Sequence, residues 1–155
     1  MKSQSVSALL TCSFIALLGM GVASAKDKPV KLADLPKAVQ QTAQEQSKEG
    51  TVVGYAKEIE KGKTEYEVQL LVNGKTRDVA IDPSGKILET EQEVDLESIP
   101  DKAKDAIKKR AGSGKIEKVE EVKSGDSIRY EAHVRSGAKR HEILVNEAGE
   151  PAKED

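Results

Sequence analysis

The chain of 155 residues has few side chains that could form disulfides or a large aromatic core: it contains one Cys, no Trp and one Phe. A single cysteine excludes an internal disulfide framework and a four-thiolate zinc site. The formal net charge is -2 at pH 7, which argues against nucleic-acid binding, because neutralising phosphates needs an excess of Lys and Arg. The length suits one compact domain or two very small ones. Composition therefore excludes several classes of protein without naming a function.

The first residues have the pattern of a cleavable leader. Lys2 precedes an apolar stretch over residues 8–18, and Ala23-Ser24-Ala25 offers the small residues that signal peptidase accepts. The apolar stretch is shorter than the ~20 residues of a membrane span. We predict a Sec-type signal peptide over residues 1–25, cleaved after Ala25, and a periplasmic or secreted protein without stable membrane insertion. Lipidation of Cys12 is the less favoured alternative, because most of the apolar run follows that cysteine.

Removing this leader leaves Tyr55, Tyr66 and Tyr130 as the only aromatic residues. The core of the mature chain must then be built from Val, Ile, Leu and Ala, and a chain of this size buries only a small core.

The most informative internal feature is a repeat. The segment over residues 30–36 returns at 94–100, and the same displacement carries Gly50 onto Gly114 and Tyr66-Glu67 onto Tyr130-Glu131. The apolar positions of the two segments also coincide. We predict a first repeat over residues 26–92 and a second over residues 93–155.

Each repeat has the pattern of a helix followed by a β-meander. Pro36 and Pro100 suit helix starts, predicting helices over residues 36–47 and 100–111. First strands are expected at 52–59 and 116–122, and Asn73-Gly74 favours a two-residue type I′ hairpin turn. A fourth strand is expected at 87–94, whereas Pro151 stands at the corresponding position of the second repeat. The predicted fold class is α+β: two tandem repeats, each with one helix packed on a three- or four-stranded antiparallel meander. Whether the two sheets join is open.

Candidate binding residues are few. The hairpin register places His133 outward beside Glu142 and places His141 inward opposite Val134, so a metal shared by the two histidines is disfavoured. A surface His–Glu pair is the simpler interpretation. Tyr66 and Tyr130 are candidate binding residues too, although core aromatics are the simpler interpretation.

Other charged groups favour structural roles. Strand alternation predicts that carboxylates such as Glu67 and Glu120 lie on a solvated face. Asp82 and Asn146 stand near glycine turns, where turn capping is favoured over calcium binding. The run Lys108-Lys109-Arg110 complements a helix dipole, with a binding patch as the alternative.

No Gly-x-Ser-x-Gly nucleophile motif is present. We therefore predict a protein that is not an enzyme, with no catalytic residues, no cofactor and no metal ligands.

The order of these motifs resembles the PepSY-like domain. The first repeat carries Leu35-Pro36-Lys37-Ala38-Val39, then Tyr66-Glu67-Val68 and Asn73-Gly74-Lys75, then Asp82-Pro83-Ser84-Gly85. The second carries Ile99-Pro100, Ile116-Glu117-Lys118-Val119, Tyr130-Glu131-Ala132 and Asn146-Glu147-Ala148-Gly149. Tandem copies are also similar in architecture to the secreted β-lactamase-inhibitor fold.

The resemblance implies a secreted or periplasmic binding module that inhibits or regulates a peptidase or another envelope enzyme, with that enzyme as its protein partner. The alternative is a structural or ligand-sequestering envelope protein that binds a peptide or small molecule on its sheet face.

Overall fold

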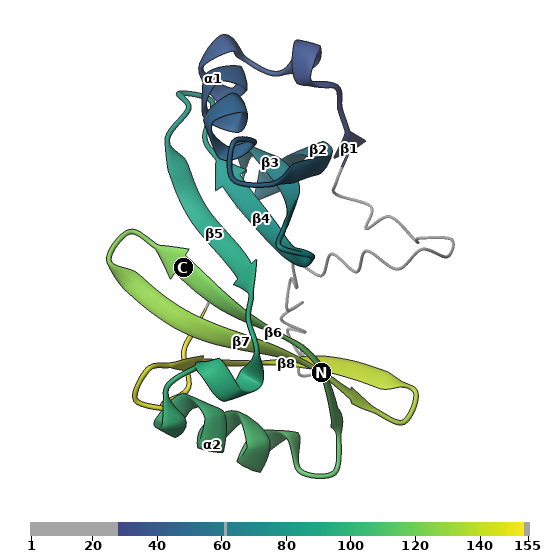
Figure 1. Ribbon diagram of the computed structural model, residues 1–155, viewed down its shortest axis with the longest axis vertical. Helices are drawn as coiled ribbons and strands as arrows, with labels where there is room; N and C mark the ends of the chain where they lie inside the picture. The colour runs from purple at the N-terminus through teal and green to yellow at the C-terminus, as the bar shows by residue number, and fades with distance from the viewer. Residues whose placement is uncertain (1–27, 61, 154–155) are drawn as a thin grey trace, which may run out of the picture.

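A computed structural model of the chain describes residues 28–60 and 62–153 (Figure 1). The predicted signal peptide and its cleavage after Ala25 fall outside these residues. Among the described residues, no helix is both long and apolar enough to cross a lipid bilayer.

The described strands form one antiparallel sheet in which each strand pairs with its neighbours in the sequence, in the order β1-β2-β3-β4-β5-β6-β7-β8. Their bounds are β1 Lys28–Pro29, β2 Thr51–Glu60, β3 Lys63–Val72, β4 Lys75–Ile81, β5 Ile87–Glu93, β6 Lys115–Ser124, β7 Ser127–Ser136 and β8 Lys139–Asn146.

The predicted fold class, α+β with two tandem repeats that each pack one helix on a three- or four-stranded antiparallel meander, is wrong. The structure has one eight-stranded sheet with α1 and α2 as the α-helices of its described part, so the fold is mostly β. The physical reason is the pairing of β5 with β6, which runs from Thr90 opposite Lys123 to Glu93 opposite Glu120. This pairing continues the hydrogen-bond ladder across the boundary between the two predicted repeats.

The helices lie close to the predicted ranges. α1 spans Lys37–Gln46 and α2 spans Asp101–Ala111, and a short 3-10 helix precedes each, at Leu32–Asp34 and Leu96–Ser98. Pro36 and Pro100 are the N-cap residues, so each helix begins one residue later than the sequence predicted.

The hairpin register is as predicted. Val68 pairs with Val79 and Tyr130 pairs with Val145. Asn73 and Gly74 both have positive φ, 54° and 81°, as a type I′ turn requires.

Two separate hydrophobic cores lie between the sheet and the helices. Val39 and Ala43 of α1 are buried against β3 and β4, together with Leu35, Val68, Leu70, Val79 and Ile81. Ala103, Ile107 and Ala111 of α2 are buried against β6, β7 and β8, together with Ile99, Val119, Tyr130, Ala132, Val134, Ile143 and Val145. Apart from Tyr130, both cores use Val, Ile, Leu and Ala, as the composition indicated.

The turn after β4 packs onto α1, and the turn after β8 packs onto α2. Gly85 has φ +90°, and a Cβ there would lie 2.9 Å from the carbonyl oxygen of Ala38; Gly149 has φ +79° and would place a Cβ 2.4 Å from the carbonyl oxygen of Lys102. Only glycine combines that φ with such an approach. These turns anchor each helix to its strands.

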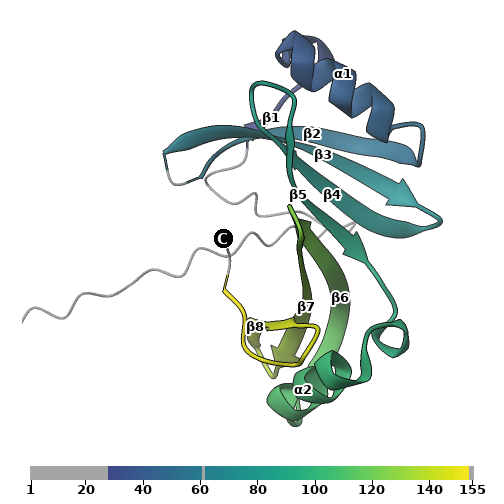
Figure 2. The same cartoon turned by 90° about the vertical axis from the view of Figure 1, so that its left-hand side faces the viewer.

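Both helices cover the same face of the sheet. Figure 2 shows α1 and α2 at opposite ends of the molecule, with strands β2–β4 and β6–β8 turned toward each other on the side away from the helices. The strand corresponding to β5 is missing after β8, where the described chain makes only an isolated bridge between Val145 and Pro151.

Candidate functional site

The face of the sheet turned away from the helices, which we call the polar face, is lined by charged side chains. Strand alternation and register place on it Glu58, Glu65, Glu67, Asp78, Glu89, Glu91, Glu93, Lys118, Glu120, Arg129, Glu131, His133, Arg135, Arg140 and Glu142. Carboxylates outnumber cations, and several are buried. Glu67 is 8% exposed, Glu120 1% and Glu131 9%.

The prediction that these carboxylates lie on a solvated face is therefore wrong for Glu67 and Glu120. The alternation was correct. However, the two parts of the sheet turn toward each other on this side (Figure 2), so polar-face side chains cover one another instead of facing bulk water.

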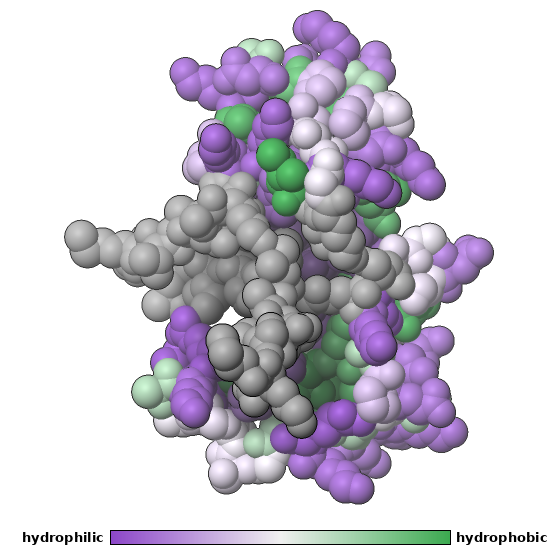
Figure 3. Space-filling view, turned by 180° about the vertical axis from the view of Figure 1, so that it is seen from behind, coloured by the Kyte–Doolittle hydropathy of each residue, from purple (hydrophilic) through white to green (hydrophobic). Residues whose placement is uncertain are grey.

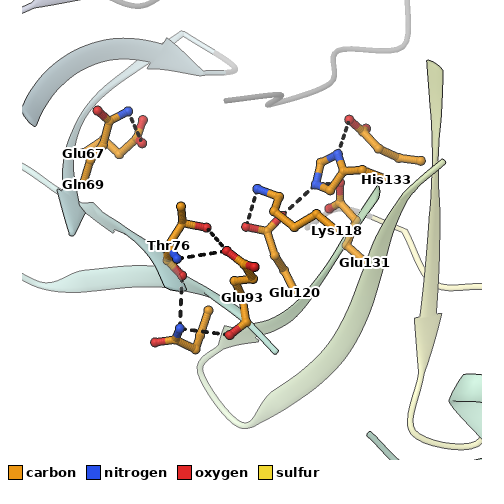
Figure 4. A network of polar contacts seen from close by, with 10 residues as sticks. Glu67, Gln69, Thr76, Glu93, Lys118, Glu120, Glu131 and His133 are labelled. Atoms are coloured by element: carbon orange, nitrogen blue, oxygen red, sulfur yellow. Dashed lines mark hydrogen bonds and ion pairs between the residues drawn. The ribbon is translucent and has the colours of Figure 1, made fainter. Parts of the chain in front are cut away.

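His133 is the centre of a hydrogen-bonded network on this face (Figure 4). Its Nε2 lies 2.7 Å from Glu120 Oε2 and 3.5 Å from Glu131 Oε1, and its Nδ1 lies 3.5 Å from Glu142 Oε1. Lys118 Nζ donates to the other oxygen of Glu120 at 2.7 Å. Two cations thus neutralise the most deeply buried carboxylate of the polar face.

The electrostatics of this network favour the imidazolium form of His133. Burial alone would lower the pKa of His133, but the hydrogen bonds with Glu120 and Glu142 outweigh it and raise the pKa to about 9. Burial also acts to raise the pKa of Glu120, yet His133 and Lys118 bring that pKa below its ordinary value. His133 and Glu120 therefore form a charged pair at neutral pH.

A second group of carboxyls lies beside this pair. Burial, followed by the charges of Glu120 and Glu131, raises the pKa of Glu91 to about 9. Burial and the charge of Asp78 raise the pKa of Glu67 to about 10, and burial raises the pKa of Asp78 itself to about 6. Glu67 and Glu91 are thus neutral at pH 7, because few cations are available to compensate them.

Two triads have the composition of cation sites. Glu131, His133 and Glu142 form one, Asp78, Glu91 and Glu120 form the other, and in each the ligand atoms lie within 4.8 Å of one another. A metal ion at either triad would have to displace protons, from His133 in the first and from Glu91 in the second. The triads are therefore acid-rich sites where a cation and protons compete.

The candidate residues from the sequence divide into two groups. His133 and Glu142 meet on the polar face in the predicted register, within a buried network and not at an open surface. Tyr130 is 5% exposed and belongs to the α2 core, while Tyr66 is half-buried against the α1 core. His141 pairs with Val134, so it lies on the opposite face from His133.

The turn residues cap their own turns. Asp82 Oδ1 accepts hydrogen bonds from the backbone N–H groups of Ser84 and Lys86 at 2.8 and 3.0 Å. Asn146 Oδ1 accepts one from the N–H of Glu150 at 3.0 Å. The capping interpretation is confirmed at both turns.

Sequence reasoning missed Asp78, Glu91 and Glu120 as site residues. A signal was present in the sequence. Acidic residues recur at alternate positions from 89 to 93 and again at 117, 120 and 121, not far from His133 in the chain. What the sequence lacked was the pairing of β5 with β6, which brings Glu91 beside Glu120.

The chain matches the model of the family described as "Putative beta-lactamase-inhibitor-like, PepSY-like" over residues 22–89 and 70–150. It therefore belongs to this PepSY-like family, which confirms the resemblance drawn from its motifs. No curated protein matches the chain.

Solved structures share the fold. A protein from Bacteroides eggerthii described as "putative periplasmic" is 18% identical, with a TM-score of 0.64 over 77% of this chain and 86% of that protein. A BLIP-like protein from Bacteroides fragilis is 18% identical, with a TM-score of 0.58 over 78% of this chain and 85% of that protein. At such identities the likeness concerns the fold alone.

Proposed function

We infer that this chain is a periplasmic or secreted, non-catalytic binding module that inhibits or regulates a peptidase or another envelope enzyme. Membership of an inhibitor-like family supports binding in preference to catalysis, and the periplasmic description of a structural neighbour supports the location. The division into a leader over 1–25 and repeats over 26–92 and 93–155 is part of this proposal.

The polar face is the proposed contact surface, and the convergence of Asp78, Glu91 and Glu120 is the observation that carries this choice. These three carboxyls bring oxygen atoms within 4.8 Å of one another on the face that neither helix covers. Like-charged groups so close together create a strong preference for a cation. A Lys or Arg side chain of the partner enzyme supplies that charge, and its approach drives the proton off Glu91, whose pKa of about 9 keeps it neutral in the free protein.

Capture from an envelope extract tests this proposal. Immobilised protein should enrich a specific enzyme, identified by mass spectrometry, and purified protein should reduce that enzyme's activity. The variant Asp78→Asn/Glu91→Gln removes the titratable carboxyls with little change in size, so enrichment should fall at least about tenfold, which corresponds to one lost charge-assisted contact.

The matched control is Glu45→Gln/Asp105→Asn, which makes the same chemical changes on the two helices, and it should capture the enzyme as the wild type does. Equal capture by wild type and the polar-face variant would exclude this face as the contact surface. Failure of the wild-type protein to enrich any enzyme would exclude the function.

Sequestration of a small cationic ligand is a second candidate function, favoured by the triad of Glu131, His133 and Glu142. Equilibrium dialysis against Zn²⁺ and Ca²⁺ at pH 7 separates the two functions. Micromolar binding that is lost in Glu131→Gln supports sequestration, and the absence of binding excludes these two ions as its ligands.

A further inference from the structure

The structure divides into two lobes that are joined through a narrow part of the sheet. Strands β1–β4 with α1 form the first lobe, strands β6–β8 with α2 form the second, and their hydrophobic cores share no residue. Strand β5 pairs with β4 from Ile87 to Gln92 and with β6 from Thr90 to Glu93. Within β5, only Thr90, Glu91 and Gln92 therefore pair on both sides, and we call these three residues the waist.

Beyond the waist, side chains take the place of the backbone ladder between β4 and β5 (Figure 4). Glu93 Oε2 accepts hydrogen bonds from the N–H and the hydroxyl of Thr76, each at 3.1 Å, and Gln92 Nε2 donates to the carbonyl oxygen of Thr76 at 3.0 Å. Lys75 Nζ lies 2.8 Å from Asp95 Oδ2. Such polar side-chain contacts can exchange with water. A small, polar connection between two packed units allows them to rotate about a hinge.

Carboxyl groups meet across the waist on the polar face. Asp78 belongs to β4 and the first lobe, Glu120 belongs to β6 and the second lobe, and Glu91 lies in the middle of the waist. Their oxygen atoms lie within 4.8 Å of one another. The closeness of the two parts of the polar face (Figure 2) therefore has an electrostatic cost, which grows with each carboxyl that ionises.

The cations near this triad already bind other carboxylates. The charged groups on the strands around Glu91 are Glu67 on β3, Asp78 on β4, Glu89 and Glu93 on β5, Lys118 and Glu120 on β6, and Arg129, Glu131 and His133 on β7. Lys118 and His133 bind Glu120. Arg129 binds Glu89. A negative charge on Glu91 is thus added to a group in which acids outnumber bases.

We propose that β5 is a hinge between the two lobes and that the triad of Asp78, Glu91 and Glu120 operates it. The lobes are closed over the polar face while Glu91 keeps its proton, and they open when all three carboxyls are ionised. Opening separates Asp78 from Glu120 and lets water reach both, which relieves the repulsion without breaking either hydrophobic core. The hinge goes beyond the proposed function, because it operates without a partner.

The protonation of the triad sets the pH at which the hinge moves. Burial and neighbouring acids raise the pKa of Glu91 to about 9, so this carboxyl is neutral at pH 7 and ionises in alkaline solution. The pKa of Asp78 is raised to about 6, and that of Glu120 is below its ordinary value. The triad therefore carries one negative charge below about pH 6, two between about pH 6 and 9, and three above about pH 9.

Distances between spin labels test the hinge. Ile59 on β2 and Lys139 on β8 are exposed and lie toward the outer edges of the two lobes. Labels at Ile59→Cys and Lys139→Cys, in a chain whose single native cysteine is removed by Cys12→Ser, report opening through double electron–electron resonance. Between pH 7 and pH 9.5 the mean distance should increase by at least about 5 Å, the spacing of neighbouring strands. Circular dichroism should not change, because both cores stay folded.

Two variants identify the carboxyl that is responsible. Glu91→Gln resembles the protonated form, so the distance between the labels should keep its pH 7 value up to pH 9.5. Glu147→Gln makes the same change at an exposed position in the turn after β8 and should open as the wild type does. Added salt should reduce the opening, because it screens the repulsion between carboxylates that have become hydrated.

Any of three results would overturn the hinge. The first is a distance between the labels that does not change with pH. The second is opening of Glu91→Gln to the same extent as the wild type, which would assign the movement to another group such as His133. The third is a loss of circular dichroism together with the change in distance, which would be unfolding. The test contains no partner enzyme, so none of these results bears on the capture experiment.

Discussion

Arg129 on β7 and Glu89 on β5 form an ion pair that spans the intervening strand β6: Arg129 Nη2 donates to Glu89 Oε2 at 2.6 Å. The same guanidinium donates through Nη1 to the carbonyl oxygen of Lys153 at 2.7 Å. The side chain of Arg129 is 5% exposed. Through Arg129, strand β7 of the α2 core is therefore linked both to β5, which follows the α1 core, and to the C-terminal segment.

Replacing Arg129 by Met should lower the free energy of unfolding by about 2 kcal/mol, because two charge-assisted hydrogen bonds are lost while the aliphatic volume is retained. Glu89 is partly exposed and can be rehydrated. Urea denaturation followed by circular dichroism measures this loss. The control Arg135→Met removes a pair with Glu117 that is more exposed, so its effect should stay below about 1 kcal/mol. Equal losses for the two variants would contradict the role of Arg129.

Replacing His133 by Gln should destabilise the protein by about 3 kcal/mol, because Glu120 would keep its buried charge with Lys118 as its only cation. Combining His133→Gln with Glu120→Gln should recover part of this loss, since the buried charge is then removed. His141→Gln, at an exposed position of the opposite face, is the matched control and should have almost no effect. A double variant less stable than His133→Gln would show that the network is not organised around this ion pair.

Stability should fall as the pH rises from neutral to about 9. His133 has a raised pKa in the folded state, so its contribution is complete below the ordinary value of 6.5 and is lost as the pH rises through about 9. Glu91 also binds its proton more tightly when folded, so unfolding releases a proton between pH 4.5 and about 9, and stability again decreases with pH. Thermal denaturation at pH 5, 7 and 9 measures the trend.

The variant Glu91→Gln isolates one part of this pH dependence. Glutamine resembles the protonated carboxyl, so the variant should match the wild type near pH 4.5. At pH 9 its midpoint should be higher by about 10 °C or more, because a pKa raised from 4.5 to about 9 corresponds to about 6 kcal/mol. For the control variant Glu45→Gln, on the exposed surface of α1, the plot of midpoint against pH should be parallel to that of the wild type. A Glu91→Gln curve that is also parallel would show that Glu91 has an ordinary pKa.

Replacing Tyr130 by Ala should cost about 3–5 kcal/mol, because its ring is buried in the α2 core. Tyr66→Ala removes the same side chain from a half-buried position and should cost less, about 1–3 kcal/mol. Chemical denaturation compares the two variants directly. A loss of a few tenths of a kcal/mol for Tyr130→Ala would place the ring in solvent and make it a binding residue again.

The sequence predicted the features that depend on residues close together in the chain, namely turn type and hairpin register. Asn73-Gly74 determined a turn type, and the turn determined the register of β3 and β4. The repeat carried that register over to β7 and β8, where it places His133 beside Glu142. It could not predict the pairing of β5 with β6, because alternation shows which face a side chain occupies but not which strand lies next to it. That pairing brings Glu91 beside Glu120. It also lets the two parts of the sheet face each other, which buries carboxylates that alternation alone places in solvent.

Exposed apolar side chains are few on this molecule. Val53, Ile59, Leu71 and Ile87 are the large ones in the described part of the chain. Seen from behind, the surface that is not grey is mostly hydrophilic, with apolar residues in small groups (Figure 3). Contacts with partners must then depend mainly on charge, as we propose for the polar face.

The strand order has a consequence for how the chain folds. Each described strand pairs with the strand next to it in sequence, so most ladders close over a tight turn, and the longest connections are the helical segments 30–50 and 94–114. Such local connections close quickly. A chain that emerges gradually from a ribosome or a translocation channel can therefore add one hairpin at a time, in order, without waiting for its C-terminal residues. The α1 core can form while β6, β7 and β8 are still to appear, and β5 then offers the edge on which the rest of the sheet assembles.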